Sequence, residues 1–495
     1  MSIEQNELIE QRLKKLKELR RRGLDPFAIE RFDRTNMSEE LISGFEQYEE
    51  KEVAIAGRIV SFRPMGKASF AHVQDGEGKI QIYIKADVVG PEAYSVIELM
   101  DIGDIIGVYG KVGKTRTGEV TVFASSFKVM AKSLRPLPIG KQKGDQQWYG
   151  LEDVETRYRE RYADLVVNPE VKDTMAKRSR IIRTIRAFLD NQGFMEVETP
   201  VLQAVAGGAA ARPFNTYYNA LDHNFHLRIS LELYLKRVIV GGFEKVYELG
   251  RVFRNEGLST RHNPEFTLLE LYQAYTNLEG MMDLVEKMFC AVAIEIHGSL
   301  QFKFQEHDLD LTPPWPRIPL LEGIRQYSGV LPEEFKTVES AKAAGERLGL
   351  PMESETSIGG IVDKIHEKFV QPKLIQPTFI TDFPIDISPL AKKDQDNPEM
   401  TRRFEPYICG QEVGNAFSEI NDPIDQRDRF VQQAKMRAAG DDEAHPMDED
   451  FLRALEYGMP PTGGLGVGID RLVMLFTDAP SIRDVILFPQ LRPEK

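Results

Sequence analysis

The segment 251–275, RVFRNEGLSTRHNPEFTLLELYQAY, holds the densest group of side chains that could do chemistry. Two stretches with strand-like alternation flank a loop at 257–264. Alternation predicts two shared faces, Glu248, Arg254 and Glu256 on the first strand and Phe266, Glu270 and Tyr272 on the second. A surface that mixes acids, an arginine and aromatics suits a charged ligand. A single cross-strand ion pair would instead be ordinary for an exposed hairpin.

A second candidate lies near the C-terminus, where GGLGVGIDRLVML predicts a glycine-rich turn directly before a helix that carries Arg471. Glycine lets a backbone approach a ligand closely, and an arginine can pair with phosphate oxygens. The run lacks the Gly-Lys-Ser/Thr of a P-loop, and Ile469 stands where a dinucleotide fingerprint needs its last glycine. Taken alone, a turn of this kind is more often structural.

The sign of the charge around the hairpin indicates what kind of ligand binds. The candidate lining is acidic or neutral and consists of Glu232, Glu270, Tyr272, Asn415, Phe417 and Glu419. Alternation directs Asn415, Phe417 and Glu419 to the same side. Buried carboxylates without a cation are unfavourable, so these acids predict a cationic ligand.

The elements that must position these residues fall into two kinds. Residues 53–132 contain five short alternating strands with a hairpin at Asp75-Gly76 and a helical piece at about 92–100, which predicts a closed barrel of the OB type. Beyond residue 169, helices and widely separated strands with a weak βαβ rhythm predict a mainly antiparallel α+β domain. We expect a helical basic arm at 1–50, the barrel at 51–140, a linker at 141–170 and the α+β domain at 171–495, with a helical insertion at about 319–371.

Composition restricts the class of protein. The 495 residues are 42% hydrophobic and 28% charged, as in a globular protein, and no apolar run approaches the ~20 residues of a membrane helix. No secretory signal is visible, and Cys290 and Cys409 fit no zinc or disulfide pattern, so we expect a cytoplasmic protein.

The net charge of −14 argues at first against a nucleic-acid partner. Residues 11–22, however, contain basic residues at seven positions against the single acid Glu18. Leu13, Leu16 and Leu19 recur through this stretch at helical spacing. It is either a solvated helix with one apolar stripe or a basic arm that contacts phosphates.

Three motifs carry a specific resemblance. Phe253-Arg254-Asn255-Glu256 resembles motif 2 of the class II aminoacyl-tRNA synthetases, and Gly466-x-Gly468-x-Asp470-Arg471 resembles their motif 3. GFMEVETPVL, with Pro200, is similar to motif 1, the dimer-interface element. The three occur in the family's order behind a predicted OB barrel, as in the subgroup that charges lysine, aspartate and asparagine. The resemblance covers essentially the whole chain.

The resemblance implies roles for the candidate residues. Arg254 would hold the α-phosphate and the amino-acid carboxylate, and Arg471 the γ-phosphate, which makes these two the catalytic residues. The other expected ATP-binding residues are Glu256, His262, Asn263, Phe266 (stacked on adenine), Glu405 and Glu412. Glu405 and Glu412 resemble carboxylates that hold Mg²⁺, which prefers hard oxygen ligands. Singly, His262 would more often be a loop residue and Glu405 a surface acid.

The same resemblance favours lysine as the amino acid. Glu419 and Tyr272 would bind the ε-ammonium, and Glu232 and Glu270 the α-ammonium. Gly208, in the run GGAAARPF, matches a lysyl-type loop that closes on the substrate. The complete expected lysine site is Gly208, Glu232, Arg254, Glu270, Tyr272, Asn415, Phe417 and Glu419.

In the barrel, Phe70 and Gln81 match positions that stack on and read the central anticodon base, and Arg63 and Glu119 resemble further anticodon contacts. An aromatic with polar neighbours on a barrel face suits single-stranded RNA, whereas a lone Phe70 would more often be core. The implied protein is a homodimer that joins lysine to tRNA(Lys) with ATP and Mg²⁺. Aspartyl- or asparaginyl-type enzymes, a non-catalytic RNA-binding relative and an enzyme that lysylates proteins are the alternatives.

Overall fold

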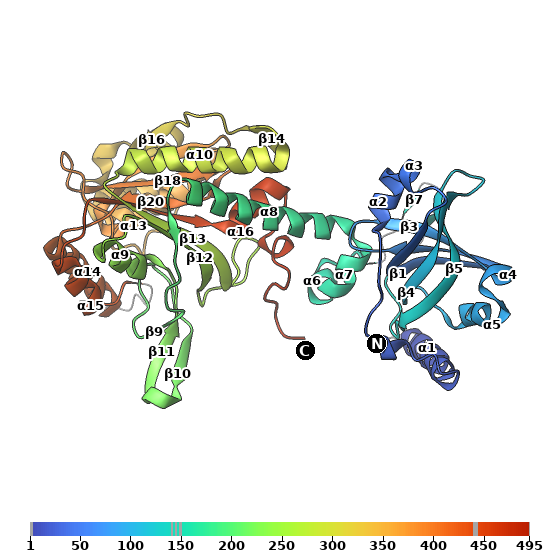
Figure 1. Cartoon of the computed structure of the whole chain (residues 1–495). Helices are drawn as coiled ribbons and strands as arrows, with labels where there is room; N and C mark the ends of the chain where they lie inside the picture. Colours follow the sequence, from blue (N-terminus) through green and yellow to red (C-terminus); the bar gives the residue numbers. More distant parts are fainter. Residues whose placement is uncertain (1–2, 140–141, 144–145, 148–150, 439–443, 495) are drawn as a thin grey trace. The chain divides into compact units, whose positions relative to one another are not determined.

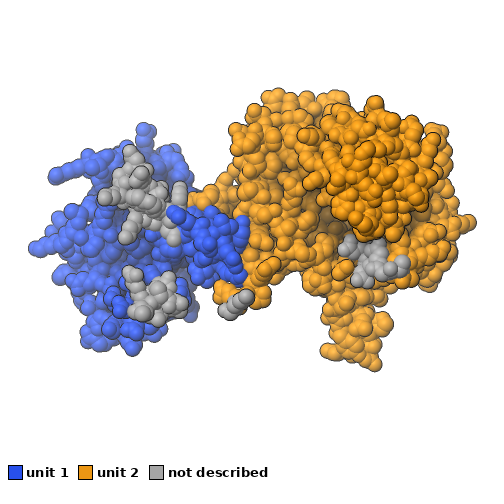
Figure 2. Space-filling view, turned by 180° about the vertical axis from the view of Figure 1, so that it is seen from behind, with its two compact units in different colours: residues 1–168 blue, residues 169–495 orange. Residues whose placement is uncertain are grey.

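The computed structural model describes residues 3–139, 142–143, 146–147, 151–438 and 444–494. The chain forms two compact units that meet in sequence between Asn168 and Pro169 (Figures 1 and 2). Positions 141, 144–145 and 148–150 of the predicted linker lie outside the described residues. Later positions of that linker are helical, in α6 (Val154–Arg159) and α7 (Arg161–Val167).

The predicted five-stranded barrel is confirmed. Its strands are β1 (Glu52–Met65), β2 (Ala68–Gln74), β3 (Lys79–Lys85), β4 (Ile105–Lys114) and β5 (Val120–Ala131), closed in the order β1-β2-β3-β5-β4. Alternate residues of β3, namely Ile80, Ile82 and Ile84, point into the barrel core. Helices α4 (Ala86–Val89) and α5 (Pro91–Tyr94) and a 3-10 turn (Ser95–Leu99) connect β3 to β4.

The basic arm is helix α1 (Ile3–Arg21), and it packs on the barrel. Leu16 and Leu19 are buried, while Leu13 is 37% exposed. Arg12 Nη1 donates to the carbonyl of Ser133 at 2.8 Å, and Lys15 Nζ lies 2.7 Å from Asp101. Short helices α2 (Ser38–Ser43) and α3 (Phe45–Tyr48) follow, and Leu41 also belongs to the barrel core. Two of the basic residues, Arg12 and Lys15, therefore bind the helix to the unit that contains the barrel.

The second unit is built on one sheet that is antiparallel except at its two ends, as predicted. Its strand order is β16-β17-β18-β20-β21-β13-β12-β8, with β19 beside β18. The strands are β8 (Met195–Glu196), β12 (Lys245–Phe253), β13 (Glu265–Ala274), β16 (Arg317–Pro319), β17 (Thr378–Pro384), β18 (Met400–Ile408), β19 (Gln411–Glu412), β20 (Asn415–Ser418) and β21 (Thr462–Gly468). Within this sheet, only the β8–β12 and β16–β17 pairs are parallel.

Helices cover both faces of this sheet (Figure 1). Leu269 and Leu271 of β13 face a core formed with α8 (Pro169–Asn191), α10 (Leu278–His297) and α16 (Ile469–Thr477). Leu268 and Tyr272, one residue out of phase, face the opposite side with α9 (Glu232–Val240), α14 (Pro423–Ala438) and α15 (Glu449–Glu456). The alternation in β13 thus separates a structural face from the face that carries the candidate site.

The prediction of a glycine-rich turn before the last helix was wrong in detail. The C-terminal glycine run is the interior strand β21, paired with β20 and β13, and α16 begins directly after it. At Gly464 the side chains of Tyr272 and Glu419 fill the space that a Cβ atom would take. The stretch MEVETPVL forms only β8 and the start of β9 (Leu202–Gln203). Pro200 cannot donate a ladder hydrogen bond, and the Thr199 amide donates to Glu248 instead.

The predicted insertion is helical, with α11 (Leu320–Ser328), α12 (Val338–Arg347) and α13 (Ile358–Ile365). It forms its own core with Ile380 and Tyr407 of the sheet. The remaining strands of this unit are β10 (Asn215–Tyr218) and β11 (His223–Leu227), which form a projecting hairpin in Figure 1, and β14 (Gln301–Phe304) and β15 (His307–Asp310). No described helix combines the length and apolar character needed to cross a bilayer.

Candidate active site

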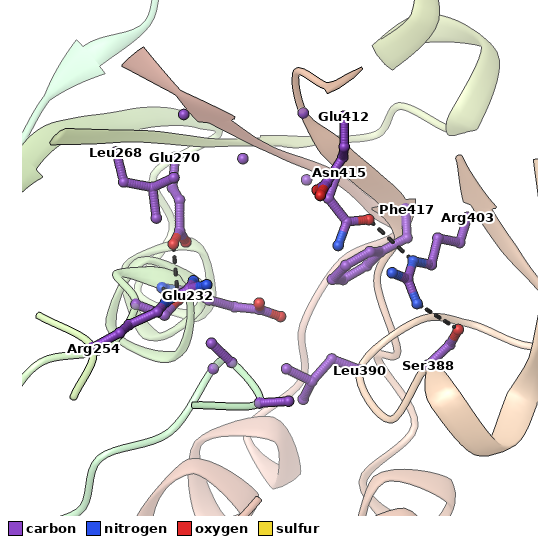
Figure 3. A pocket seen from close by; sticks show the side chains of 18 of the residues that line it. Glu232, Arg254, Leu268, Glu270, Ser388, Leu390, Arg403, Glu412, Asn415 and Phe417 are labelled. Carbon is purple, nitrogen blue, oxygen red and sulfur yellow. Dashed lines mark hydrogen bonds between the residues drawn. The ribbon is translucent and has the colours of Figure 1, made fainter. Parts of the chain in front are cut away.

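A cavity of about 590 Å³ opens on the sheet face that carries Leu268 and Tyr272 (Figure 3). Strands β13, β20 and β21 form its floor, so residues far apart in sequence meet there. The predicted residues that line it are Gly208, Glu232, Arg254, Glu256, His262, Asn263, Phe266, Glu270, Tyr272, Glu412, Asn415, Phe417, Glu419 and Arg471. In Figure 3, Glu232 and Glu270 lie on one side of the cavity, and Asn415 and Phe417 lie on the other.

Glu270 is the acid at the middle of β13. Its Oε1 accepts hydrogen bonds from Ser230 Oγ at 2.8 Å and from the Leu231 amide at 3.0 Å, and its Oε2 accepts from the Tyr272 hydroxyl at 3.1 Å. Burial raises the pKa of Glu270 to about 7, and the nearby charge of Glu232 acts in the same direction. Glu270 is therefore a buried acid without an ion-pair partner in the described part of the chain.

Lys236 is a site residue that the sequence analysis missed. Its Nζ lies 2.5 Å from Glu232 Oε1 and forms an ion pair with Glu419, and its side chain is fully buried. The i, i+4 spacing of Glu232 and Lys236 in ELYLKR was the available signal. The premise that these acids have no cation was thus wrong for two of them. Glu232 and Glu419 share this one lysine, and Glu270 forms no ion pair in the described part of the chain.

Two arginines, Arg254 and Arg471, also line the cavity. The Arg254 guanidinium lies 5.1 Å from the centre of the Phe266 ring, and burial lowers its pKa. Arg471 Nη1 donates to Glu412 Oε2 at 3.3 Å. Arg471 Nη2 lies 3.3 Å from His262 Nε2, which accepts because an arginine only donates. Burial and the charge of Arg471 lower the pKa of His262 and favour the neutral imidazole.

Asn263 lines the cavity but is already bound to the protein. Its Nδ2 donates to the Glu265 carbonyl at 2.6 Å, and its Oδ1 accepts from the Gln490 amide at 3.1 Å. These bonds hold the loop that connects β12 to β13.

Glu405 does not line the cavity, unlike Glu412. Its Oε1 accepts from Arg403 at 2.5 Å and its Oε2 from the Tyr407 hydroxyl at 2.5 Å. Burial raises the pKa of Glu412, and the neighbouring charge of Glu405 raises it further. The two carboxylates are therefore close enough to repel each other, which a cation between them would relieve. Among the residues described, no group of three or more acids, histidines or cysteines suits a metal ion.

Arg403 lines the cavity, and sequence reasoning missed it. It donates to Asn415 Oδ1 at 3.1 Å and to Ser388 Oγ at 3.0 Å, bonds that Figure 3 marks with dashed lines. Its place two residues before Glu405, on the same strand face, was the only sequence signal. It fixes Asn415 at the edge of the cavity.

Glu248 was grouped with the site by strand alternation, but it lies outside the cavity. Its Oε1 accepts from Arg228 Nη1 at 2.5 Å, and its Oε2 accepts from the Thr199 hydroxyl at 2.6 Å. These two bonds connect Glu248 of β12 to Arg228 and to Thr199, and neither of those residues lines the cavity. Arg254 and Glu256 are past the end of β12, where strand alternation no longer applies.

Gly208 lies in a left-handed conformation with φ of +89°. A Cβ atom there would stand 2.8 Å from Ser230 Oγ and 3.1 Å from Glu232 Cβ. Only glycine lets this loop pass so close to the acids.

The predicted anticodon residues share one face of the barrel. Phe70 is half-buried, and its ring centre lies 4.7 Å from that of Tyr83, which in turn lies 5.7 Å from Phe123. Arg63 is exposed and stands opposite Phe70 in the β1–β2 register. Glu119 accepts from Gln81 Nε2 at 2.7 Å, and its other oxygen lies 2.7 Å from His72 Nε2. Tyr83 and Phe123 extend the aromatic surface beyond the single residue that the sequence indicated.

An antiparallel sheet with a cavity lined by arginines and acids, in a chain that also carries an OB barrel, defines an aminoacyl-tRNA synthetase of class II. The model of the family "tRNA synthetases class II (D, K and N)" matches residues 153–492, and the model of the "OB-fold nucleic acid binding domain" matches residues 53–130.

Similar proteins cover nearly the whole chain. A lysine–tRNA ligase of Pelotomaculum thermopropionicum is 57% identical over 99% of this chain and 96% of its own. Those of Carboxydothermus hydrogenoformans and Bacillus subtilis are 56% and 52% identical over 99% of this chain and 99% and 98% of their own. The chain therefore belongs to the lysine–tRNA ligase family within the class II tRNA synthetases.

Proposed function

We propose that this enzyme activates L-lysine with ATP and Mg²⁺ and transfers the lysyl group to the 3′-terminal adenosine of tRNA(Lys). The observation that carries the proposal is one cavity lined by both kinds of charge. Arg254 and Arg471 would supply the positive charge that a triphosphate needs, and Glu232, Glu270 and Glu419 the negative charge that a diammonium ligand needs.

The first step is attack by the lysine carboxylate on the α-phosphorus. One P–O bond forms, the bond to the bridging oxygen breaks, and lysyl-adenylate and pyrophosphate result. The nucleophile is an anion at neutral pH, so no general base is needed. Arg254 would align the carboxylate with the α-phosphate, and Arg471 would hold the γ-phosphate. Alignment and fixed positive charge are the sources of rate.

The acids select the amino acid. Glu419 and Tyr272 would take the ε-ammonium, and Glu232 and Glu270 the α-ammonium. Asn415, Phe417 and Gly208 would enclose the substrate between them. An aspartyl or asparaginyl side chain would meet these carboxylates without a positive charge, which is unfavourable in a buried site.

Glu412 and Glu405 would hold the Mg²⁺ that accompanies ATP. The donor set fits a hard cation, since both ligands are carboxylates whose charges repel each other in its absence. The ion would neutralise negative charge on the triphosphate oxygens. Phe266 would stack on adenine, with Glu256, His262 and Asn263 around the nucleotide.

The barrel would bind the anticodon. Phe70 would stack on the central base, with Gln81, Arg63 and Glu119 reading its edges. The second step transfers the lysyl group from the adenylate to a hydroxyl of the tRNA terminal ribose, and AMP leaves. We further propose a cytoplasmic homodimer. The motif around Pro200 supports the dimer, and the free thiols of Cys290 and Cys409 suit a reducing compartment.

ATP–pyrophosphate exchange with each of the standard amino acids tests this function. We expect lysine alone to stimulate exchange strongly, and only when Mg²⁺ is present. Exchange driven by aspartate or asparagine, or none with lysine, would contradict the proposal. Charging of purified tRNA(Lys) with labelled lysine then tests the transfer step separately.

A further inference from the structure

Lys236 on α9 is one of the largest fully buried side chains in the molecule, yet it does not line the cavity. It lies behind two residues that do, Glu232 and Glu419, and pairs with both. Its Nζ also lies 5.4 Å from the centre of the Phe417 ring and 5.9 Å from that of Phe451. A cation enclosed by two acids and two aromatic faces is strongly held.

The groups around Lys236 leave a definite charge in this part of the cavity. Those that face it or its partners are Glu232, Glu270, Glu419, Tyr272, Arg403 and His445. Tyr272 is neutral, because burial and the three acids keep its pKa well above its ordinary value. His445 is neutral, because burial and the charge of Lys236 lower its pKa to about 4. Arg403 is occupied by Glu405.

Three carboxylates and one lysine then leave two negative charges when all three acids are ionised. A lysine substrate presents two ammonium groups to them, while its carboxylate would pair with Arg254. The charges match one to one. Without Lys236, the same ligand would face a third buried carboxylate with no cation, which burial would force into its protonated form.

The geometry around Glu419 indicates that Lys236 affects the ligand through the acids it binds. Lys236 meets one side of this carboxylate, while Oε1 has no hydrogen-bond partner in the described structure. Glu419 is 1% exposed, so an unpartnered oxygen there is unfavourable unless a ligand completes it. Lys236 thus binds one side of the Glu419 carboxylate, and Oε1 is available to a ligand.

We propose that Lys236 is a positioning residue that determines specificity: its two ion pairs hold Glu232 and Glu419 in place and favour their charged forms, and so set the pocket to accept a ligand with two ammonium groups. This rests on the proposed function, because it assigns the acids to the substrate amino acid. It adds a resident cation to a site whose recognition would otherwise be attributed to acids alone.

Lys236→Met in the full chain tests the proposal by ATP–pyrophosphate exchange. Loss of a charge-assisted bond at each acid should raise the KM for lysine about tenfold near pH 7.5. Calculated for the diammonium form of lysine, the KM should fall again between pH 7.5 and pH 9, because the acids of the variant re-ionise, whereas the wild-type KM stays nearly flat over that range. Selectivity for lysine over norleucine, which lacks the ε-ammonium, should also fall about tenfold, since a protonated acid tolerates a neutral side chain.

Lys236→Arg retains the charge and should keep a lysine KM that is flat with pH. Lys245→Met is the matched control, because its Nζ donates to the Gln192 carbonyl at 2.9 Å outside the cavity. Circular dichroism establishes that each variant folds. If the Met variant does not fold, the Arg variant decides. A raised KM for lysine that does not change with pH would then overturn the proposal.

An unchanged KM and an unchanged selectivity for lysine in folded Lys236→Met would equally overturn it. So would a raised KM for lysine that does not fall again at high pH. Those outcomes are distinct from failure of the proposed function, in which the wild-type enzyme itself would show no lysine-dependent exchange.

Discussion

A Cβ atom added at Gly464 would lie 2.6 Å from Cε1 of Tyr272, because the two residues stand opposite each other in the β13–β21 register. The same added atom would collide with Oε1 of Glu419. The glycine of an interior strand therefore provides the space for the hydroxyl-bearing ring and the carboxylate that the proposed ε-ammonium site requires. This is a steric reason for glycine in a strand, where it is otherwise unfavourable.

Gly464→Ala should therefore weaken lysine use and stability together. Displacing the Tyr272 ring should lower kcat/KM for lysine, and overpacking should reduce the free energy of unfolding by about 1–3 kcal/mol. Exchange kinetics and urea unfolding measure the two effects. Gly468→Ala is the matched control, since a Cβ there meets no heavy atom within 4 Å. Equal effects of the two substitutions on stability would contradict the steric explanation.

The buried pair of Arg228 and Glu248 should act on stability. Both side chains are at most 6% exposed, and their closest atoms lie 2.5 Å apart. Glu248→Gln should reduce the free energy of unfolding by about 3–5 kcal/mol, because it leaves the arginine buried without its counter-ion. Glu449→Gln removes the exposed pair with Arg427 and should change the free energy of unfolding far less, because solvent screens that pair. If chemical denaturation showed similar losses of stability for the two variants, the distinction between the buried and the exposed pair would be refuted.

Strand alternation predicted much of the site because it depends only on local geometry. Phe266, Glu270 and Tyr272 lie on one face of β13, and Asn415, Phe417 and Glu419 line the same cavity from β20 and the residue after it. The barrel was predicted for the same reason, since Ile80, Ile82 and Ile84 alternate with exposed or half-buried residues. These patterns need no knowledge of distant contacts.

What the sequence did not reveal depends on tertiary partners. Glu248 has the same alternation signal as a site residue, and only the position of Arg228 shows that it is structural. Glu232 and Glu419 seemed to lack a cation because Lys236 meets Glu419 across 183 positions of the chain. The strand nature of β21 was hidden because its glycines lack β propensity and are stabilised by neighbours on β13 and β20.

Lysine use should fall in acid because of Glu270. Its pKa is about 7 in the ligand-free protein, raised by burial, so the carboxyl is neutral below that pH and ionised above it. Only the ionised form pairs with the α-ammonium. The pH profile of kcat/KM for lysine, which reports groups of the free enzyme, should therefore decline below about pH 7.

Glu270→Gln tests the origin of that decline. The amide keeps acceptor capacity for Ser230 but has no charge, so kcat/KM for lysine should be low and its acidic limb near pH 7 should disappear. Persistence of the limb in this variant would assign the titration to another group.

Recognition of tRNA should depend on Phe70 without affecting amino-acid activation. The ring is half-buried beside Tyr83, on a surface next to Gln81 and Glu119. Removing a base-stacking aromatic costs about 1–3 kcal/mol, so Phe70→Ala should raise the KM for tRNA(Lys) roughly tenfold or more. Lysine-dependent ATP–pyrophosphate exchange should keep its wild-type rate, because the activation site lies in the other unit.

Tyr457→Ala provides the control for removal of an exposed aromatic, since this side chain is 82% exposed at the end of α15. Its aminoacylation kinetics should match those of the wild-type enzyme. If Phe70→Ala leaves the KM for tRNA unchanged while lowering barrel stability, the ring belongs to the barrel core. If it slows exchange as well, the two units are coupled, and the barrel does more than bind the anticodon.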